Sequence, residues 1–454
     1  MRKLVIFLSL MTLLMPSALL LSCDTDADAD ETPTTPDNKP ENVFEELNRW
    51  MYGQMNHSYL WREDLPDSTK CNYDQSPRDF LKSILSPHDR FSYLIANPNY
   101  SPSECLDYGF AYQTYADQSG RKALYVLYQT VPSNHYAPGD FLRVISKNAA
   151  GIALRKVRLT PQQTFEDIPG SDFILTATDI FKPASSVLKD TIFTLADRNI
   201  GYLCYLEFDS TSDLAEPLQN FHEAHIDDLI LDLRYNPGGY VATCQYLCNC
   251  IVNESAYEQI FQQCSYNSII AAQNFQETGD ARSYSYYKRP SSSPGHTISA
   301  PILPLNLSRL FVITSAHTAS ASEATIICLR PYMQVCIIGE RTVGKGVGSW
   351  SITDKRFRYG IQPITMRYYN ADGLSTPDEG LEPDYAMPNG YNTTRKTIGD
   401  PEEPLLNQAL RLICPQAFPQ PASASTTTSE TSLTPVGEPS YIQAFQNKHC
   451  KYEN

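Results

Sequence analysis

The stretch Thr318-Ala319-Ser320-Ala321-Ser322-Glu323 lies between two apolar segments, one at 310–314 and one that continues to Leu329. The first segment has the length of a buried strand, and the second has the composition of a buried helix. We therefore predict that Ser320 lies where a strand ends and a helix begins. The free N–H groups and the dipole at such a helix start would favour an oxyanion beside the serine.

The stretch Gly344-Lys345-Gly346 begins 24 residues after Ser320 and supplies a possible base. A serine hydroxyl becomes a nucleophile only when a neighbouring group takes its proton. A lysine can take that proton only as a free amine, which requires burial to lower the usual lysine pKa of about 10.4. A serine followed three residues later by Glu323 is also a capping box, and Gly-Lys-Gly is also an ordinary turn. These two motifs alone therefore leave a structural role open.

A third motif, the run Leu231-Asp232-Leu233-Arg234-Tyr235-Asn236-Pro237-Gly238-Gly239, strengthens the case for catalysis. Residues 228–233 predict a buried strand, residues 236–239 a tight turn and residues 240–252 a helix. The adjacent Gly238 and Gly239 would let backbone N–H groups approach a substrate carbonyl closely.

These motifs, in this order, resemble the C-terminal processing peptidases, the tail-specific serine/lysine proteases. The matching stretches are LDLRYNPGG, SAHTASASE, ERTVGKG and Gly380-Leu381-Glu382-Pro383-Asp384, and the resemblance covers 199–412. It implies a catalytic dyad and an oxyanion hole, with supporting side chains around them. The implied residues are Ser320 as nucleophile, Lys345 as base, the backbone N–H groups of Gly239 and Ala321 as the oxyanion hole, and Gly238, Glu323 and Thr342 as support.

One position departs from the family pattern. Several relatives have a glutamine four residues after the lysine that orients the amine, and this chain has Ser349 there. A hydroxyl can accept a hydrogen bond from an amine, so we expect a plain dyad with Ser349 in a supporting place. His317 is an alternative base, but a side chain so close to a serine on such a turn is expected to line the cleft or to be solvated. The chain has no G-x-S-x-G motif at this serine, which argues against an α/β-hydrolase.

Strands and helices alternate through residues 186–415, which predicts an α/β domain. The resemblance narrows this domain to a crotonase-like ββα superhelix that forms the serine/lysine peptidase core. The expected strands and helices are 200–208, 214–222, 228–233, 240–252, 310–314, 320–330 and 335–339.

Residues 105–185 change to a strand pattern, with expected strands at 110–115, 123–131 and 141–145. This β-rich region resembles a PDZ domain, which binds a peptide C-terminus by adding it as a strand to a sheet edge. Tyr108-Gly109-Phe110 stands in place of the carboxylate-binding loop, and Pro138-Gly139-Asp140 in place of the family's Gly-Asp turn. Because the usual helix is compressed to 132–136, a working peptide site and a structural vestige both stay open.

The region 42–104 predicts a small helical unit. Apolar residues recur at helical spacing from Val43 to Met55, and Ser76-Pro77 begins a second helix that runs to Leu85. Nothing in this unit suggests chemistry, and we interpret the aromatic residues at 59–61 and 91–94 as packing.

The N-terminus predicts the compartment. Arg2-Lys3, the apolar run 4–21 and then Ser22-Cys23 resemble a bacterial lipoprotein signal peptide, residues 1–22, with Cys23 as the lipidated residue. A simple secretory peptide and a transmembrane anchor are the alternatives. Residues 23–41 then form an acidic, flexible tether. We expect a lipid-anchored protein of the bacterial cell envelope that faces the periplasm or the cell surface.

Composition limits the partners. The net charge of -15 argues against nucleic acid as a partner. The length of 454 residues is too great for a single hydrophobic core, so we expect more than one domain. Cys244, Cys248 and Cys250 look at first like a metal cluster, but no histidine lies nearby. Buried thiols or an incidental disulfide explain them better than zinc, so we expect neither metal nor cofactor. Residues 416–454 predict a low-complexity linker and tail.

The combined prediction is an extracytoplasmic serine endopeptidase that cleaves protein or peptide substrates near their C-termini through an acyl-enzyme. The alternative from another class is a catalytically silent peptide-binding or scaffold lipoprotein of the same fold. The presence of both Ser320 and Lys345 weighs against that alternative. The sequence does not predict an oligomeric state.

Overall fold

The computed structural model describes residues 44–96, 108–148, 151–176, 185–290, 300–357, 359–388, 395–417 and 433–450. The predicted signal peptide, Cys23 and the tether lie outside these residues. Across the described ranges, no helix has the length and apolar character needed to cross a bilayer.

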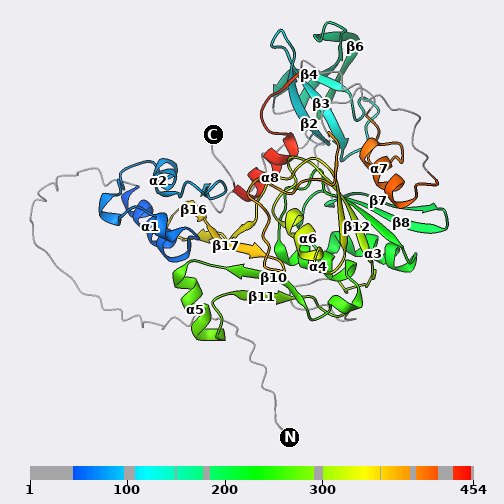
Figure 1. Cartoon of the computed structure of the whole chain (residues 1–454). Coiled ribbons are helices and arrows are strands. Elements are labelled where there is room, and N and C mark those ends of the chain that lie inside the picture. The colour runs from blue at the N-terminus through cyan, green and yellow to red at the C-terminus, as the bar shows by residue number, and fades with distance from the viewer. Residues whose placement is uncertain are drawn as a thin grey trace, which may run out of the picture. The chain divides into compact units, whose positions relative to one another are not determined.

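A six-stranded sheet forms the centre of the α/β domain, in the order β18-β13-β12-β9-β8-β7 (Figure 1). Neighbouring strands are parallel from β8 to β18, and β7 is antiparallel to β8. Every residue of β9 is buried, as expected for a parallel strand with both faces covered. The bounds are β7 (Val187–Leu195), β8 (Arg198–Tyr205), β9 (Asp228–Asp232), β12 (Arg309–Thr314), β13 (Gln334–Gly339) and β18 (Tyr385–Ala386).

Helices cover both faces of this sheet. Apolar residues of α3 (Ser212–Glu223), α4 (Val241–Ile251) and α6 (Ala321–Leu329) form one core with the first face. The second face packs against α7 (Pro404–Ile413). The α/β class is confirmed, and each predicted strand and helix of the core is present within three residues of its expected ends.

Two smaller sheets were not predicted. One has the order β11-β10-β17-β14 and the other the order β1-β16-β15. Their strands are short, and β11 alternates between half-buried and exposed residues, so they carry little apolar signal. The bounds are β1 (Tyr93–Ala96), β10 (Ile260–Ser265), β11 (Ser283–Tyr286), β14 (Val347–Ser349), β15 (Ile352–Thr353), β16 (Tyr359–Gln362) and β17 (Ile364–Tyr369).

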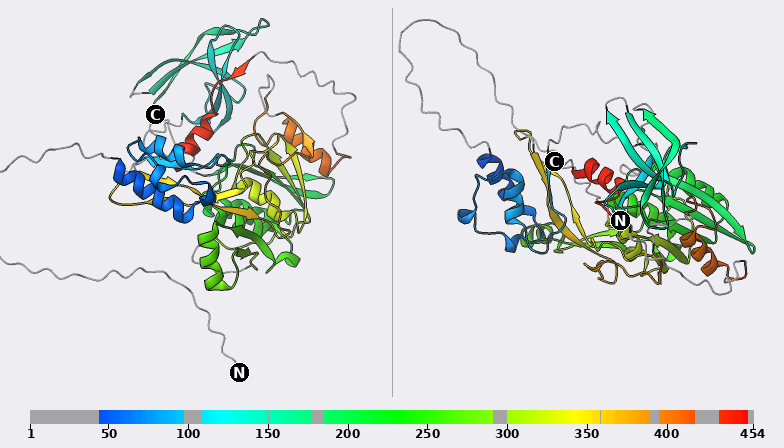
Figure 2. Two further views of the ribbon diagram at one scale, coloured as in Figure 1. Left: turned by 60° about the vertical axis from the view of Figure 1, so that its left-hand side comes forward. Right: turned by 90° about the horizontal axis from the view of Figure 1, so that it is seen from above.

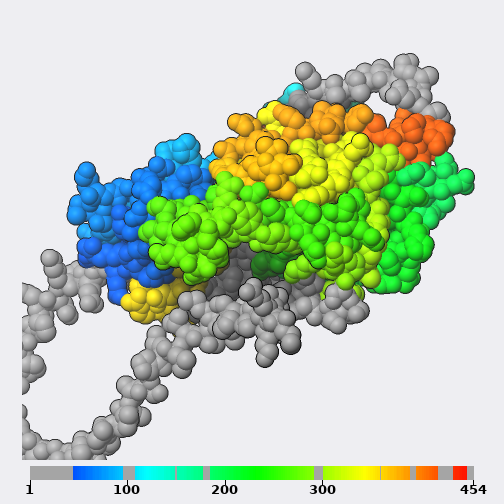
Figure 3. Space-filling model, turned by 60° about the horizontal axis from the view of Figure 1, so that its bottom comes forward, coloured from blue at the N-terminus to red at the C-terminus, as the bar shows by residue number. Residues whose placement is uncertain are grey.

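The N-terminal region contains α1 (Glu45–Ser58) and α2 (Pro77–Ile84), as predicted. The Ser76 hydroxyl accepts a hydrogen bond from the Asp79 N–H at 3.2 Å, and Pro77 occupies the first turn, so both helix-start signals are used. The two helices pack with Val347 and neighbouring residues of β14, β16 and β17. In Figure 3 this region (blue) adjoins the surface that contains α5 (Ser268–Thr278, green).

Residues 108–148 and 151–176 contribute five strands, β2-β3-β4-β5-β6, to an antiparallel sheet whose sixth strand, β19, comes from the C-terminal segment; we call these five strands the β2–β6 domain. The three predicted strands are present, and β5 and β6 extend the sheet. No helix occurs in its described ranges, 108–148 and 151–176, in line with the compressed helix of the sequence. The bounds are β2 (Phe110–Ala116), β3 (Lys122–Gln129), β4 (Phe141–Asn148), β5 (Gly151–Leu159) and β6 (Phe165–Thr176).

The C-terminal segment differs from the predicted linker and tail. Residues 433–450 form β19 (Thr434–Pro435) and α8 (Ser440–Cys450), and Leu433 and Ile442 are buried. The sequence did not predict β19 and α8 because the segment is short and follows a Ser/Thr-rich stretch. Its order comes from packing against distant parts of the chain, which composition does not reveal.

A buried ion pair ties the end of β9 to α7. Arg234 is only 1% exposed, and its guanidinium donates to both oxygens of Glu403, at 2.7 and 2.8 Å, and to Asp232 at 2.9 Å. Glu403 also caps α7, because its carboxylate accepts the Leu406 N–H at 2.9 Å. Burial alone would raise the pKa of Glu403, but the charge of Arg234 outweighs burial and lowers the pKa below the usual 4.5.

Glu403→Gln should lower the free energy of unfolding by about 3 kcal/mol, because it leaves a buried charge incompletely paired. The folded state holds the Glu403 proton less tightly than the unfolded chain. The stabilisation is therefore present above about pH 4.5 and is lost as the pH falls through the folded pKa. Urea unfolding at pH 7 and pH 4 measures both effects. The control is Glu402→Gln, because the Glu402 side chain is 73% exposed. This substitution should change the free energy of unfolding little.

Candidate active site

Ser320 lies in a strained turn between β12 and α6. Its φ is 59° and its ψ is -115°, a conformation that costs energy for any residue with a side chain. The turn is held because the Thr318 hydroxyl donates to the Leu233 carbonyl at 2.8 Å and the Val343 N–H donates to the Thr318 carbonyl at 3.0 Å. The structure confirms the predicted position of Ser320 at a strand-to-helix junction, and it places a strained backbone there without a G-x-S-x-G motif.

Asn236 connects this turn to the glycine pair. Its amide nitrogen donates to the Tyr205 carbonyl at 3.0 Å, and its side-chain oxygen accepts the Gly238 N–H at 2.9 Å. Its backbone carbonyl accepts the Ser322 hydroxyl at 3.0 Å. The buried Asn236 therefore orients the 236–239 turn through its side-chain amide and attaches it to the first turn of α6 through its backbone carbonyl.

Gly238 and Gly239 cannot be replaced without movement. Their φ values are 115° and 138°, where side chains are disfavoured. A Cβ on Gly238 would lie 2.8 Å from the Ser320 Cβ, and a Cβ on Gly239 would lie 2.4 Å from the Phe208 carbonyl oxygen. The same hypothetical Cβ of Gly238 would lie 3.2 Å from the Ala321 nitrogen, so the glycine turn borders both the serine and the helix start.

The two N–H groups predicted for an oxyanion hole come from Gly239 and Ala321. In the described part of the chain, neither N–H donates a hydrogen bond to another protein group. Ala321 is the first residue of α6, so its N–H points out of the helix start towards the side of the serine. These two donors are therefore open to a ligand.

Glu323 joins the serine turn to the lysine loop. Its carboxylate is fully buried and accepts four hydrogen bonds. One oxygen takes the N–H groups of Ser320 (2.9 Å) and Lys345 (2.8 Å), and the other takes the Thr342 hydroxyl (2.5 Å) and the Gly344 N–H (2.7 Å). Burial raises the pKa of Glu323 above its usual 4.5, and the four hydrogen bonds oppose that rise. The two predicted catalytic residues are thus held by one side chain.

The lysine loop is fixed from its other side by residues 378–381. Leu381 donates its N–H to the Thr342 hydroxyl at 2.8 Å and accepts the Thr342 N–H at 3.2 Å. Gly344 has a φ of 86°, and a Cβ there would lie 2.2 Å from the Asp378 carbonyl oxygen. The motif at 380–384 therefore supports the loop that carries Lys345.

The N-terminal region reaches this loop, which the sequence did not predict. Arg90 donates to the carbonyls of Gly344 at 3.1 Å and Asp378 at 2.8 Å. The Phe91 ring centroid lies 5.4 Å from the Lys345 Nζ, within the range of a cation–π contact. We interpreted residues 91–94 as packing because an arginine next to an aromatic residue carries no spacing signal.

Two further residues named in the sequence analysis, Ser349 and His317, make contacts of their own. The Ser349 hydroxyl accepts a hydrogen bond from the Gln362 side chain at 3.0 Å. His317 faces the C-terminal segment, with its Nδ1 3.5 Å from Glu438 and its ring in edge contact with Tyr441. Burial lowers the pKa of His317 below 6.5, against the opposing effect of Glu438 and Glu340.

The predicted peptide-binding loop belongs to the β2–β6 domain. The side chains of Tyr108 and Phe110 are buried in its core, so only backbone groups of this loop could contact a peptide. Gly109 has a φ of 76°, and its carbonyl accepts the N–H groups of Thr130 and Val131.

Cys244, Cys248 and Cys250 are buried free thiols in α4. Within the described residues, no group of His, Cys, Asp and Glu side chains has an arrangement that could hold a metal ion.

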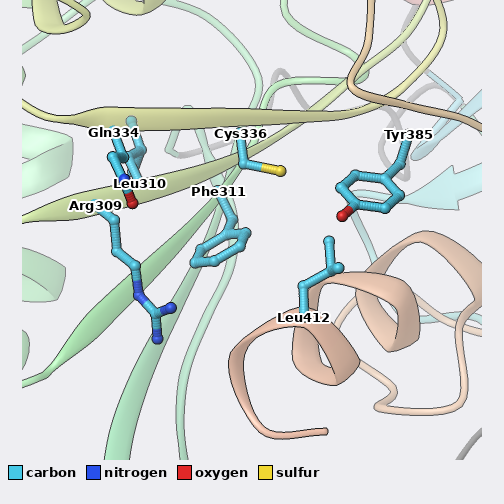
Figure 4. A pocket seen from close by; sticks show the side chains of 7 residues that line it. All are labelled: Arg309, Leu310, Phe311, Gln334, Cys336, Tyr385 and Leu412. Atoms are coloured by element: carbon cyan, nitrogen blue, oxygen red, sulfur yellow. The ribbon is translucent and has the colours of Figure 1, made fainter.

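A pocket of about 200 Å³ lies beside the first residues of β12 in the central six-stranded sheet (Figure 4). It is lined by Arg309, Phe311, Cys336, Tyr385 and residues around them. Arg309 begins β12, whereas Ser320 follows the end of β12, so this pocket is separate from the candidate active site.

Comparison with known proteins agrees with this geometry. A family model for peptidase family S41 matches residues 199–387, and a model for the peptidase S41 N-terminal domain matches residues 46–93. The chain therefore contains two domains of peptidase family S41, and both of them meet at Lys345.

The curated relatives are C-terminal processing proteases. The chain is 25% identical to carboxyl-terminal-processing peptidase 1, chloroplastic, of Arabidopsis thaliana over 41% of this chain and 33% of that protein. It is 23% identical to the carboxy-terminal processing protease CtpB of Bacillus subtilis over 42% of this chain and 34% of that protein. The match spans about a third of the length of these relatives.

A solved structure from Bacteroides fragilis, assigned to the S41 proteases, has the same fold. Its TM-score with this chain is 0.66 at 23% identity, over 80% of this chain and 96% of that chain.

Glu323→Gln should lower the free energy of unfolding by about 2 kcal/mol, because an amide offers one acceptor oxygen where the carboxylate offers two. Glu323→Ala should cost more, since four donors then lose their acceptor. Thermal and urea unfolding measure the losses. The control is Glu382→Gln, an exposed residue of the same region with a surface ion pair, and it should change stability little. Equal effects at 323 and 382 would contradict the assigned role of Glu323.

Proposed function

We propose that this chain is a serine endopeptidase that cleaves polypeptides near their C-termini, with Ser320 as nucleophile and Lys345 as general base. The observation that carries the proposal is the carboxylate of Glu323, which binds the backbone N–H groups of both residues at 2.9 and 2.8 Å. A capping box alone would explain the bond from the Ser320 N–H, but it would not explain the bond from the Lys345 N–H.

In this mechanism, the Ser320 hydroxyl attacks the scissile carbonyl while the Lys345 amine takes its proton. The carbonyl oxygen becomes an oxyanion and accepts the N–H groups of Gly239 and Ala321. Lys345 then gives its proton to the leaving amine, and the peptide bond breaks to leave an acyl-enzyme. A water molecule, deprotonated by Lys345, releases the second product and restores the serine.

The surroundings support a lysine base. A carboxylate offers about four acceptor positions, and backbone and hydroxyl donors fill those of Glu323. Glu323 can therefore position the lysine loop through the backbone N–H groups of Gly344 and Lys345. The Phe91 ring centroid lies 5.4 Å from Nζ, so the amine has an apolar neighbour on that side.

We further propose a crotonase-like core, a PDZ-like β2–β6 domain that receives the substrate, and a lipid anchor at Cys23 in the bacterial cell envelope. The parallel order of β8, β9, β12 and β13 with helices on both faces supports the first proposal. The place of β2 as the outermost strand of the β2–β6 domain, where it pairs with the two-residue β19 of the C-terminal segment, supports the second. The third rests on the sequence around Cys23.

Ser320→Ala and Lys345→Arg should each lower kcat/KM for an unstructured peptide by at least about a thousandfold, because arginine keeps the charge but cannot act as a base at neutral pH. Their thermal unfolding should stay close to that of the wild type. Lys355→Arg, at a lysine outside the site, is the matched control. A Lys345→Arg variant that cleaves at the wild-type rate would refute the base assignment.

Cys23→Ser should abolish lipid attachment, because only a thiol can form the thioether. Mass spectrometry of the full chain purified from a bacterial membrane fraction should show acyl chains on the wild type and none on the variant. Cys71→Ser is the control and should stay acylated. Wild-type protein without acyl chains, found in the aqueous phase, would overturn the lipoprotein proposal.

A further inference from the structure

The C-terminal segment 433–446, which we call the strap, occupies the outer edge of β2. β19 pairs antiparallel with β2, so that Thr434 lies opposite Ala116. The Val436 N–H donates to the Thr114 carbonyl at 2.8 Å, and the Tyr112 N–H donates to the Ser440 hydroxyl at 2.8 Å. Because β3 is the only other neighbour of β2 in this sheet, the strap covers what would otherwise be an exposed sheet edge.

The strap has the position and direction of an added peptide strand. It runs along β2 from Ala116 to Tyr112, which is towards the loop at Tyr108-Gly109-Phe110. Addition of an extended peptide to a sheet edge is a common mode of peptide recognition, in which main-chain bonds give affinity and side-chain sites give specificity. The strap uses both, and Figure 2 shows it (red) alongside the strands of the β2–β6 domain (teal).

Two side chains anchor the strap. Leu433 is buried in the apolar core of the β2–β6 domain. Eight residues later, the Tyr441 ring lies 5.3 Å from the ring of Tyr235 and 5.9 Å from that of His317, measured between centroids. Tyr235 directly precedes Asn236, and His317 lies three residues before Ser320, so the second anchor rests on both turns that build the candidate active site.

α8 also lies close to β1, the strand that begins two residues after Phe91. Phe91 in turn lies against Lys345. Tyr441 therefore touches the segment next to the candidate nucleophile, and the helix that contains it lies near the segment next to the candidate base.

The edge pairing of the strap is short. β19 has two residues, and Pro435 and Pro439 have no N–H to donate. Such a strand binds weakly as a separate peptide, but attachment to the same chain gives it an effective concentration in the millimolar range. A longer peptide strand without proline can make more bonds to β2, so it can compete with the strap.

We propose that the strap is a built-in occupant of a peptide-docking edge, and that a polypeptide that pairs with β2 and places an aliphatic and an aromatic residue in the sites of Leu433 and Tyr441 displaces it and opens the approach to Ser320. The first part of this proposal, which we call the docking half, is that a peptide replaces the strap on β2, and it does not depend on enzymatic activity. The second part, which we call the opening half, is that this replacement opens the approach to Ser320, and it rests on the proposed function.

The test inserts the recognition site of an unrelated sequence-specific protease within residues 421–430 of the full chain. After folding, the strap is cut from the body and removed by gel filtration, and the uncut protein is the control. A fluorescein-labelled peptide with the sequence of residues 432–446 then reports binding by anisotropy. We expect at least tenfold tighter binding to the cut protein, and about tenfold weaker binding of the peptide with Tyr441→Ala.

A second variant avoids the insertion. Tyr441→Ala in the full chain should loosen the strap and strengthen peptide binding at least fivefold, and Tyr286→Ala, at an exposed tyrosine of β11, should not. Equal binding to cut and uncut protein, or no binding to either, would overturn the docking half.

Hydrolysis of an unstructured peptide tests the opening half, with an expected rate at least fivefold higher for the cut protein than for the uncut protein. An equal, measurable rate in both would overturn the opening half. If both proteins were inactive while the labelled peptide bound the cut protein as expected, the proposed peptidase function would fail and the docking edge would stand.

Discussion

One buried carboxylate organises the candidate active site. Glu323 lies on the first turn of α6, and its two oxygens collect donors from the serine turn and from the lysine loop, which are far apart in sequence. A desolvated carboxylate is costly unless such donors satisfy it. Each element must therefore reach its correct place for the other to be stable, and the geometry of the site is coupled to the folding of the core.

The sequence predicted the parts of this site that depend on local pattern. The junction at Ser320, the glycine turn at 236–239 and the strands of the parallel sheet follow from apolar runs and turn residues, and each lies where expected. Glu323 was expected in a supporting place, but only the structure shows that it binds the Lys345 N–H. Such a bond depends on how β12 and β13 pair in the sheet, and the spacing of residues along the sequence does not specify that pairing.

Other features could not be predicted because their stability comes from distant residues. Phe91 contacts Lys345 through a packing arrangement in which α1 and α2 rest on β14, β16 and β17. The first two of these strands have only three and four residues, too few for a clear sequence signal. The C-terminal segment has the composition of a tail, yet Leu433 and Tyr441 find apolar and aromatic neighbours more than 190 residues away. A composition-based interpretation of either segment lacks the information that decides it.

The strained backbone of Ser320 has a consequence for protein engineering. At a φ of 59° and a ψ of -115°, a glycine would relieve the local strain that any side chain imposes. Directed evolution that selects only for heat resistance should therefore enrich glycine at this position, although glycine has no hydroxyl. Libraries built to make this protein more robust need an activity screen at each round, because the residue that thermostability favours here is one that removes the proposed nucleophile.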